Sequence, residues 1–166
     1  ASAMLAQAGS DATVHLRGDA DAYDAATREI SLCASTYNGT DAASMALACH
    51  EAGHALQRAE SGIEGGASGA VRTASLACWA LWVVALVASL VFANGMCAMA
   101  TCALWCVAVL CGLAPCRLEA DASRRALAFM RSVSVPAVAL AVSRRVLRIS
   151  LCEHLAAAFA PVQILR

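Results

Sequence analysis

The residues best suited to chemistry are two histidines and a glutamate within positions 50–54. His50 and His54 are four residues apart, so on a helix they share one face and can bind one divalent metal ion, most often zinc. Glu51 lies beside them, where it can act as a general base towards a water molecule. This His-Glu-x-x-His pattern predicts a hydrolytic metal site. The alternative is a surface helix whose two histidines bind no metal.

The flanking sequence favours a helix around these residues. Positions 41–49 are rich in residues that favour helices, and Thr40 before them is suited to an N-cap. Gly62 is suited to the end of the helix. We therefore expect a helix between Thr40 and Gly62.

A catalytic zinc ion usually has three protein ligands, so one ligand remains to be found. The candidates elsewhere in the chain are Glu119, Asp121, His15 and His154. Residues 118–127 have a helical pattern, in which Asp121 can pair with Arg125 one turn later. Glu119 has no such partner on this helix, and small residues such as Ser123 beside it would let a second helix approach. We predict Glu119 as the third ligand.

Two long apolar runs indicate a membrane protein. Of the 166 residues, 60% are hydrophobic, which exceeds the share in an ordinary soluble domain. Residues 73–93 and 96–116 carry no charge, and each run can cross a hydrocarbon core of about 30 Å. The turn signal Asn94-Gly95 between them predicts a transmembrane hairpin over 73–116. The alternative is a buried pair of helices in a soluble protein.

The distribution of charge predicts how the hairpin is oriented in the membrane. It returns to the side from which it leaves, so the helix with His50 and the residues after Cys116 face one compartment. That later stretch contains Arg117, Arg124, Arg125, Arg131, Arg144, Arg145 and Arg148. The positive-inside rule then places the site on the cytoplasmic side, close to the membrane because Glu119 follows Cys116 by three residues. The net charge of zero implies no nucleic-acid partner.

The two ends of the chain have weaker patterns. Residues 1–9 look like the end of a helix that begins earlier, so we expect an upstream segment. Residues 13–17 and 27–32 alternate and predict two antiparallel strands joined by an acidic loop. An exposed edge there could pair with an extended peptide. Ser134 and Pro136 predict a helix to about Phe159, with 149–165 as a third membrane-associated segment that Pro161 would kink or end.

Several of these motifs together resemble the bacterial membrane neutral zinc metallopeptidases of the YugP type. The motifs that carry the resemblance are Tyr23-Asp24, Tyr37-Asn38, residues 48–57, the apolar hairpin and residues 119–127. The resemblance covers nearly the whole chain and implies a gluzincin-like protease whose distant Glu binds zinc. Ala22 and Ala25 depart from the His and Pro expected around Tyr23-Asp24. The family's first membrane helix is also absent, which suggests that an upstream membrane helix is missing.

We therefore expect a mainly α, integral membrane protein. It would combine zincin-like metalloprotease helices with a small two-stranded β element and a transmembrane helical hairpin. A single domain over 1–166 would comprise strands and the metal-binding helix in 1–72, the hairpin in 73–116, the third-ligand helix and Arg-rich segment in 117–148, and a third membrane segment in 149–165.

The predicted function is that of a zinc-dependent endopeptidase in the bacterial cytoplasmic membrane. Zn²⁺ on His50, His54 and Glu119 would activate a water molecule, with Glu51 as the base. The sequence does not choose the group that stabilises the oxyanion or supports the ligands; the candidates are Tyr23, Tyr37, Ser123 and Arg124. Partners would be polypeptide substrates, including membrane proteins, and the lipid bilayer. The alternative is a zinc-binding membrane scaffold without catalysis.

Overall fold

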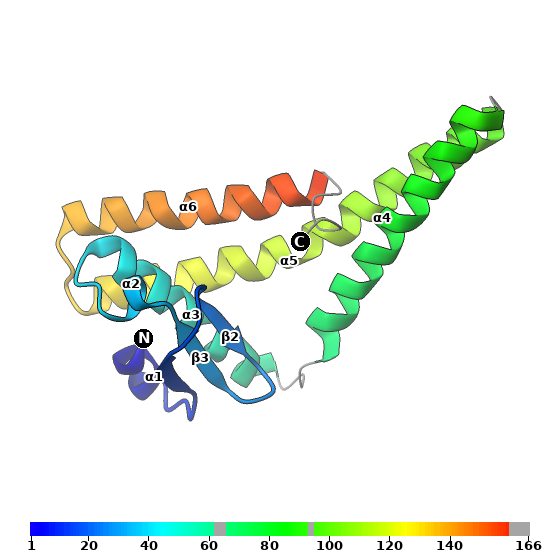
Figure 1. Cartoon of the computed structure of the whole chain (residues 1–166). Helices are drawn as coiled ribbons and strands as arrows, with labels where there is room; N and C mark the ends of the chain where they lie inside the picture. The colour runs from blue at the N-terminus through cyan, green and yellow to red at the C-terminus, as the bar shows by residue number, and fades with distance from the viewer. Residues whose placement is uncertain (62–65, 93–94, 160–166) are drawn as a thin grey trace. The chain divides into compact units, whose positions relative to one another are not determined.

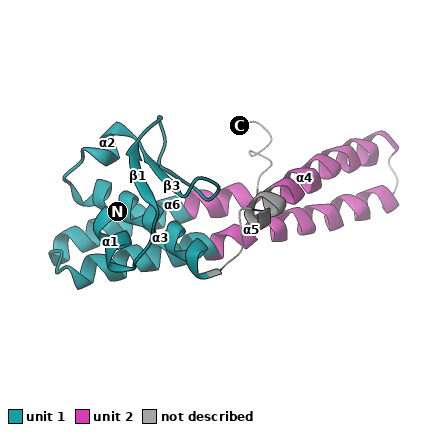
Figure 2. Cartoon of the chain, turned by 90° about the horizontal axis from the view of Figure 1, so that it is seen from below, with its two compact units in different colours: residues 1–65, 118–151 teal, residues 66–117, 152–166 magenta. Residues whose placement is uncertain are grey.

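A computed structural model describes residues 1–61, 66–92 and 95–159 (Figure 1). The chain is mainly helical and divides into two compact units, shown in different colours in Figure 2. Unit 1 comprises Ala1–Gly65 and Leu118–Leu151, and unit 2 comprises Gly66–Arg117 and Cys152–Arg166. The expectation that residues 1–166 form a single domain stays a prediction.

Unit 1 contains a small sheet of three strands. These are β1 (Thr13–Leu16), β2 (Ala22–Asp24) and β3 (Glu29–Leu32), in the spatial order β1-β3-β2. β1 pairs with β3 in parallel, and β2 pairs with β3 in antiparallel orientation. The predicted two-stranded antiparallel element is therefore wrong in strand number and in pairing.

The tight turn before β3 explains this difference. Asp24 Oδ1 accepts a hydrogen bond from the Ala26 N–H at 2.8 Å, and Arg28 has a positive φ of 57°. This turn joins β3 to a short strand inside the predicted acidic loop, so β1 is left with the other edge of β3. The chain between β1 and β3 is too long for a tight hairpin turn, so these two strands can run in the same direction.

Helices α1 (Ser2–Gln7), α2 (Ala34–Tyr37) and α3 (Ala42–Ser61) complete the N-terminal part of unit 1. The predicted metal-binding helix is α3, but its N-cap is Asp41 and the predicted Thr40 is wrong. Asp41 Oδ1 accepts hydrogen bonds from the N–H groups of Ala43 at 2.8 Å and Ser44 at 3.1 Å. Asp41 directly precedes the first helical residue, Ala42, so its carboxylate reaches these free amides, whereas Thr40 lies one residue too early. The predicted end at Gly62 lies outside the described residues.

The core of unit 1 lies between β3, α3, α5 and α6. β3 buries Ile30 and Leu32, the alternate residues on one face, against α3. Small buried residues on α3, among them Ala52, allow close packing, and Met130 and Leu147 join the cluster from the later helices. α3 is therefore packed between the sheet on one side and the later helices α5 and α6 on the other.

Unit 2 contains α4 (Gly66–Phe92) and the first part of α5 (Gly95–Ser132). Within this unit, Trp79 of α4 is fully buried against Ala108 and Val109 of α5. The ranges Thr73–Phe92 and Gly95–Ser132 are long and apolar enough to cross a membrane. Only 11% and 17% of their most apolar windows are buried, so most of these apolar side chains face outward. Asn94 of the predicted turn lies outside the described residues.

α5 contains both the second apolar run and the predicted third-ligand helix. It continues without interruption through Pro115 to Ser132. α6 (Ala137–Phe159) follows and confirms the helix predicted after Ser134 and Pro136. Among the described residues, α6 does not reach the apolarity of the two candidate spans. The predicted third membrane segment, 149–165, extends beyond the described residues, as does Pro161.

Candidate metal centre

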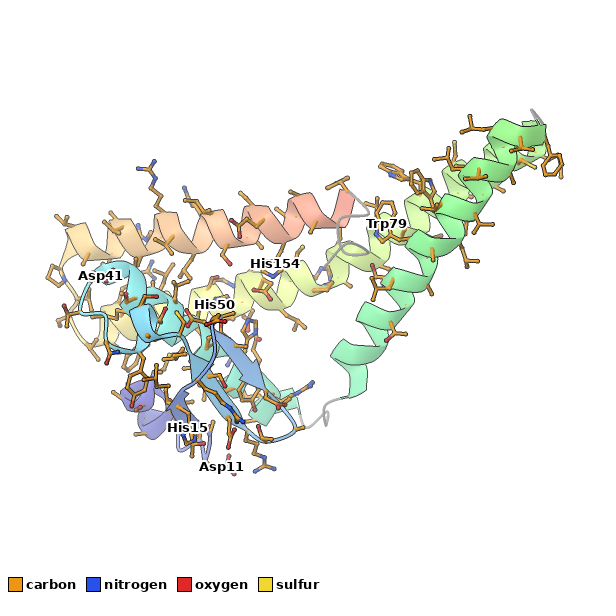
Figure 3. The ribbon with its side chains drawn as sticks, in the orientation of Figure 1. Asp11, His15, Asp41, His50, Trp79 and His154 are labelled. Atoms are coloured by element: carbon orange, nitrogen blue, oxygen red, sulfur yellow. The ribbon has the colours of Figure 1, made fainter. Side chains whose placement is uncertain are left out.

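The structure brings His50 and His54 of α3 together with Glu119 of α5, and all three belong to unit 1 (His50 is labelled in Figure 3). His50 Nε2 lies 3.1 Å from Glu119 Oε2, and His54 Nε2 lies 3.5 Å from the same oxygen. The two Nε2 atoms are 3.2 Å apart. These side chains could hold one metal ion.

The separations suit a tetrahedral metal ion. Ligand atoms at about 2.0–2.1 Å from a tetrahedral zinc ion are roughly 3.3 Å apart, close to the three separations given above. Two imidazoles and a carboxylate also form a donor set that such an ion accepts. Three atoms that face each other with lone pairs repel unless a cation or protons lie between them, so a bound metal ion would stabilise this arrangement.

Close contact between α3 and α5 makes this arrangement possible. A Cβ atom built on Gly53 would lie 2.7 Å from the carbonyl oxygen and 3.0 Å from Cα of Ala122. Ala122 is itself fully buried. Because neither residue has a long side chain, the two backbones meet directly. Glu119, one turn before Ala122, can therefore reach the histidines that flank Gly53.

Each histidine has a second polar contact through Nδ1. His50 Nδ1 is 3.2 Å from Ser123 Oγ of α5, and the His50 side chain is buried. His54 Nδ1 is 3.1 Å from Gln57 Oε1 of α3. Both contacts leave the Nε2 atoms directed at Glu119. Gln57 was missed by the sequence reasoning, although its place three residues after His54 puts it on the same helical face.

Two polar networks join α3 to α5 beside the ligands. Gln57 Nε2 donates to the Leu118 carbonyl at 2.8 Å and to Asp121 Oδ2 at 2.9 Å. Arg125 donates to Asp121 Oδ2 at 2.7 Å, which confirms the predicted pair, and forms two hydrogen bonds to Glu60 at 2.7 and 2.8 Å. The Gln57 and Arg125 hydrogen bonds lower the pKa of Asp121, and Arg125 lowers the pKa of Glu60.

Glu51 lies within the electrostatic field of the three ligand side chains. Burial raises the pKa of Glu51, although His54 and His50 act in the opposite direction. Burial disfavours the charged form of His54, but its hydrogen bond to Glu119 and the charges of Glu119 and Glu51 outweigh this effect and raise the pKa of His54. Glu51 is thus a half-buried carboxyl group that holds a proton more readily than an exposed one.

Comparison with known proteins agrees with the chemistry of this donor set. A family model described as "Putative neutral zinc metallopeptidase" matches residues 1–166. The chain belongs to this family. The match confirms the resemblance stated from the sequence. No curated protein and no solved structure matches the chain.

The other ligand candidates are not part of the group formed by His50, His54 and Glu119 among the described residues. Asp121 is occupied by Gln57, Arg124 and Arg125. His15 is exposed on β1, where its Nε2 lies 3.0 Å from Thr13 Oγ1. His154 belongs to the other compact unit. Among the described residues, the group that could hold a metal consists of His50, His54 and Glu119.

Of the four candidates for oxyanion or supporting roles, Ser123 alone contacts a ligand side chain in the hydrogen bonds described. Tyr23 lies on β2, where burial raises its pKa although the charges of Arg58 and Arg28 act in the opposite direction. Tyr37 ends α2, is 48% exposed and lines a pocket of about 460 Å³ that does not include the three ligands. Arg124 is exposed and donates to Asp121 at 3.0 Å.

Proposed function

We propose that this metallopeptidase family member is a zinc-dependent membrane endopeptidase. The observation that carries the proposal is the convergence of His50 Nε2, His54 Nε2 and Glu119 Oε2 at separations of 3.1 to 3.5 Å. Glu51 accompanies them on α3. A site that only stores a metal has no need of such a carboxyl group.

The residues divide the chemistry between binding and proton transfer. A zinc ion held by His50, His54 and Glu119 would polarise the scissile carbonyl and lower the pKa of a water molecule towards about 7. Glu51 takes a proton from the attacking water and delivers it to the leaving amine. The raised pKa of Glu51 supports this role, because a base that later acts as an acid must hold its proton for a time.

The sheet offers a place for an extended polypeptide. β2 is an edge strand of the sheet and packs against α3, the helix that carries His50, Glu51 and His54. A substrate strand added to its free edge would bring a peptide bond over Glu51. Tyr23, Tyr37 and Arg124 stay candidates for contacts with the oxyanion.

We place the enzyme in the cytoplasmic membrane with the metal site on the cytoplasmic side. The outward-facing apolar side chains of α4 and α5 support contact with lipid rather than the core of a soluble protein. The Arg excess after Cys116 supports the cytoplasmic side. Substrates would then include loops and frayed ends of membrane proteins near the bilayer surface.

The decisive experiment compares wild type with Glu51→Gln in detergent. We expect both proteins to bind one zinc ion, and the variant to lose about 100-fold or more of its proteolytic activity on casein, the range of a general base. Full activity of Glu51→Gln would refute the mechanism. Bound zinc with no cleavage of any peptide by wild type would instead favour the zinc-binding scaffold.

A further inference from the structure

Gln57 contacts the His54 side chain and two residues that flank Glu119 in α5. It lies on α3, one turn after His54, and its amide group makes three contacts. Its nitrogen contacts the Leu118 carbonyl and Asp121 Oδ2, and its oxygen contacts His54 Nδ1. Leu118 and Asp121 lie on either side of Glu119 in α5, so one side chain reaches both ligand-bearing helices.

The partners of the amide determine its orientation. A backbone carbonyl and a carboxylate only accept hydrogen bonds, so the Gln57 nitrogen must face Leu118 and Asp121. Both of its N–H groups are then used, at 2.8 and 2.9 Å. The amide oxygen is left facing His54 Nδ1 at 3.1 Å.

This orientation selects one tautomer of His54. An amide oxygen only accepts, so a hydrogen must be on His54 Nδ1, and in the neutral imidazole Nε2 then carries the lone pair directed at Glu119 and His50. That tautomer is the one that binds a metal through Nε2. His50 has no equivalent constraint from Ser123, because a hydroxyl group can donate or accept.

We propose that Gln57 is a positioning residue that holds His54 in its metal-binding tautomer and anchors it to the two flanks of Glu119. The proposal rests on the zinc site proposed above. It differs from a role in helix packing, for which Arg125 is the comparison. Arg125 also joins α3 to α5, through Glu60 and Asp121, but it makes no contact with His54 among those described.

The first test measures the zinc Kd of the full chain by competition with a chelator. Gln57→Met keeps a similar volume and removes all three hydrogen bonds, and Arg125→Met removes the other link between the helices. We expect Gln57→Met to raise the zinc Kd about 10- to 100-fold and Arg125→Met to leave it within about threefold. Equal losses in both variants would mean that Gln57 only packs helices, and no loss in Gln57→Met would overturn its role directly. Failure of wild type to bind zinc would instead refute the proposed function.

The second test reads the tautomer without metal. The chain has four histidines, so ¹⁵N-labelled histidine gives few signals. At about pH 9, where imidazoles are neutral, we expect His54 of wild type and of Arg125→Met to carry its hydrogen on Nδ1. Gln57→Met should show a mixture of tautomers. An unchanged His54 signal in Gln57→Met would overturn the proposal.

A third variant keeps the test valid if Gln57→Met does not fold. Gln57→Ala removes the same three hydrogen bonds and places no longer side chain at the contact between the helices. We expect this variant to raise the zinc Kd about 10- to 100-fold and to show His54 in mixed tautomers. A wild-type zinc Kd and a single His54 tautomer in folded Gln57→Ala would overturn the proposal.

Discussion

Glu119 distinguishes a metal centre from a pair of helical histidines, because it alone of the three ligand candidates comes from a second helix. Its Oε2 faces the Nε2 atoms of His50 and His54, and its side chain is largely buried at 16% exposure. A buried carboxylate directed at two imidazoles requires a cation or protons between them. The role of Glu119 is therefore testable by metal binding alone.

We predict that Glu119→Gln loses zinc affinity by about 100-fold or more, above the range for groups that only orient a ligand. The amide is nearly isosteric but is a much poorer ligand than a carboxylate. Zinc content after dialysis and a chelator competition would measure the loss. Glu153→Gln, at an exposed glutamate of α6, is the matched control and should bind zinc as wild type does. Wild-type affinity in Glu119→Gln would exclude this residue as a ligand.

At the scale of elements, the contact between α3 and α5 sets the geometry of the site. Gly53 and Ala122 bring the backbones together, and Gln57 and Arg125 add polar links on one side of that contact. The first interaction is steric and has no pH dependence. The second depends on charge, so the two can be tested separately.

We predict that Gly53→Ala destabilises the protein, the reverse of its usual effect in a helix. Alanine normally favours a helix over glycine by about 1 kcal/mol, but here its Cβ would meet backbone atoms of Ala122. The overpacking should cost roughly 1–3 kcal/mol in the free energy of unfolding and weaken zinc binding. Thermal unfolding in detergent measures the first effect. Gly95→Ala, where a Cβ meets nothing within 4 Å, is the control and should not destabilise.

We predict that the Arg125 ion pairs stabilise the folded protein at neutral pH and lose this contribution in acid. The pKa values of Glu60 and Asp121 are lowered in the folded state. Their contribution is thus fully present above the unfolded values of about 4 and is lost as the pH falls through the folded values. Arg125→Met should therefore unfold at a lower temperature than wild type at neutral pH, and the difference should shrink below about pH 4. The exposed Arg131→Met is the control, and a difference that grows in acid would contradict the prediction.

At the scale of the whole molecule, the order of elements along the chain would decide which side of a membrane the site faces in the proposed topology. α3 precedes two helices that are apolar enough to cross a membrane, and the candidate ligand Glu119 lies in the second of them, α5, after its apolar part. An even number of crossings returns the chain to the side from which it left. Glu60 and Arg131 both belong to unit 1, which contains the three candidate ligands His50, His54 and Glu119.

We predict that single cysteines at positions 60 and 131 of a variant without the nine native cysteines react from the cytoplasmic side. A cysteine at position 94, between the two apolar runs, should react from the opposite side. Membrane-impermeant thiol reagents on intact and opened vesicles would measure this. Labelling of positions 60 and 131 from opposite sides would refute the hairpin topology and with it a shared metal site.

Local patterns in the sequence were sufficient for much of the fold. These local features are the helix around His50 and His54, the apolar runs, α6 after Pro136, and the pair between Asp121 and Arg125. Each of them depends on residues less than a few turns apart. Helical periodicity and hydrophobicity act over such distances, so the residues themselves determine them. The helical pattern of residues 118–127 and the family resemblance both led to Glu119 as the partner of the two histidines.

Only the tertiary structure decided the contacts between distant segments. His50 and Glu119 are 69 positions apart in the chain, and local sequence patterns do not determine the distance between them in space. The parallel pairing of β1 with β3 also differed from the local pattern, because it depends on which edge of β3 the turn at Asp24 leaves free. Gln57 was missed for the same reason: its role comes from Leu118 and Asp121, which packing of α5 against Gly53 brings within hydrogen-bond distance.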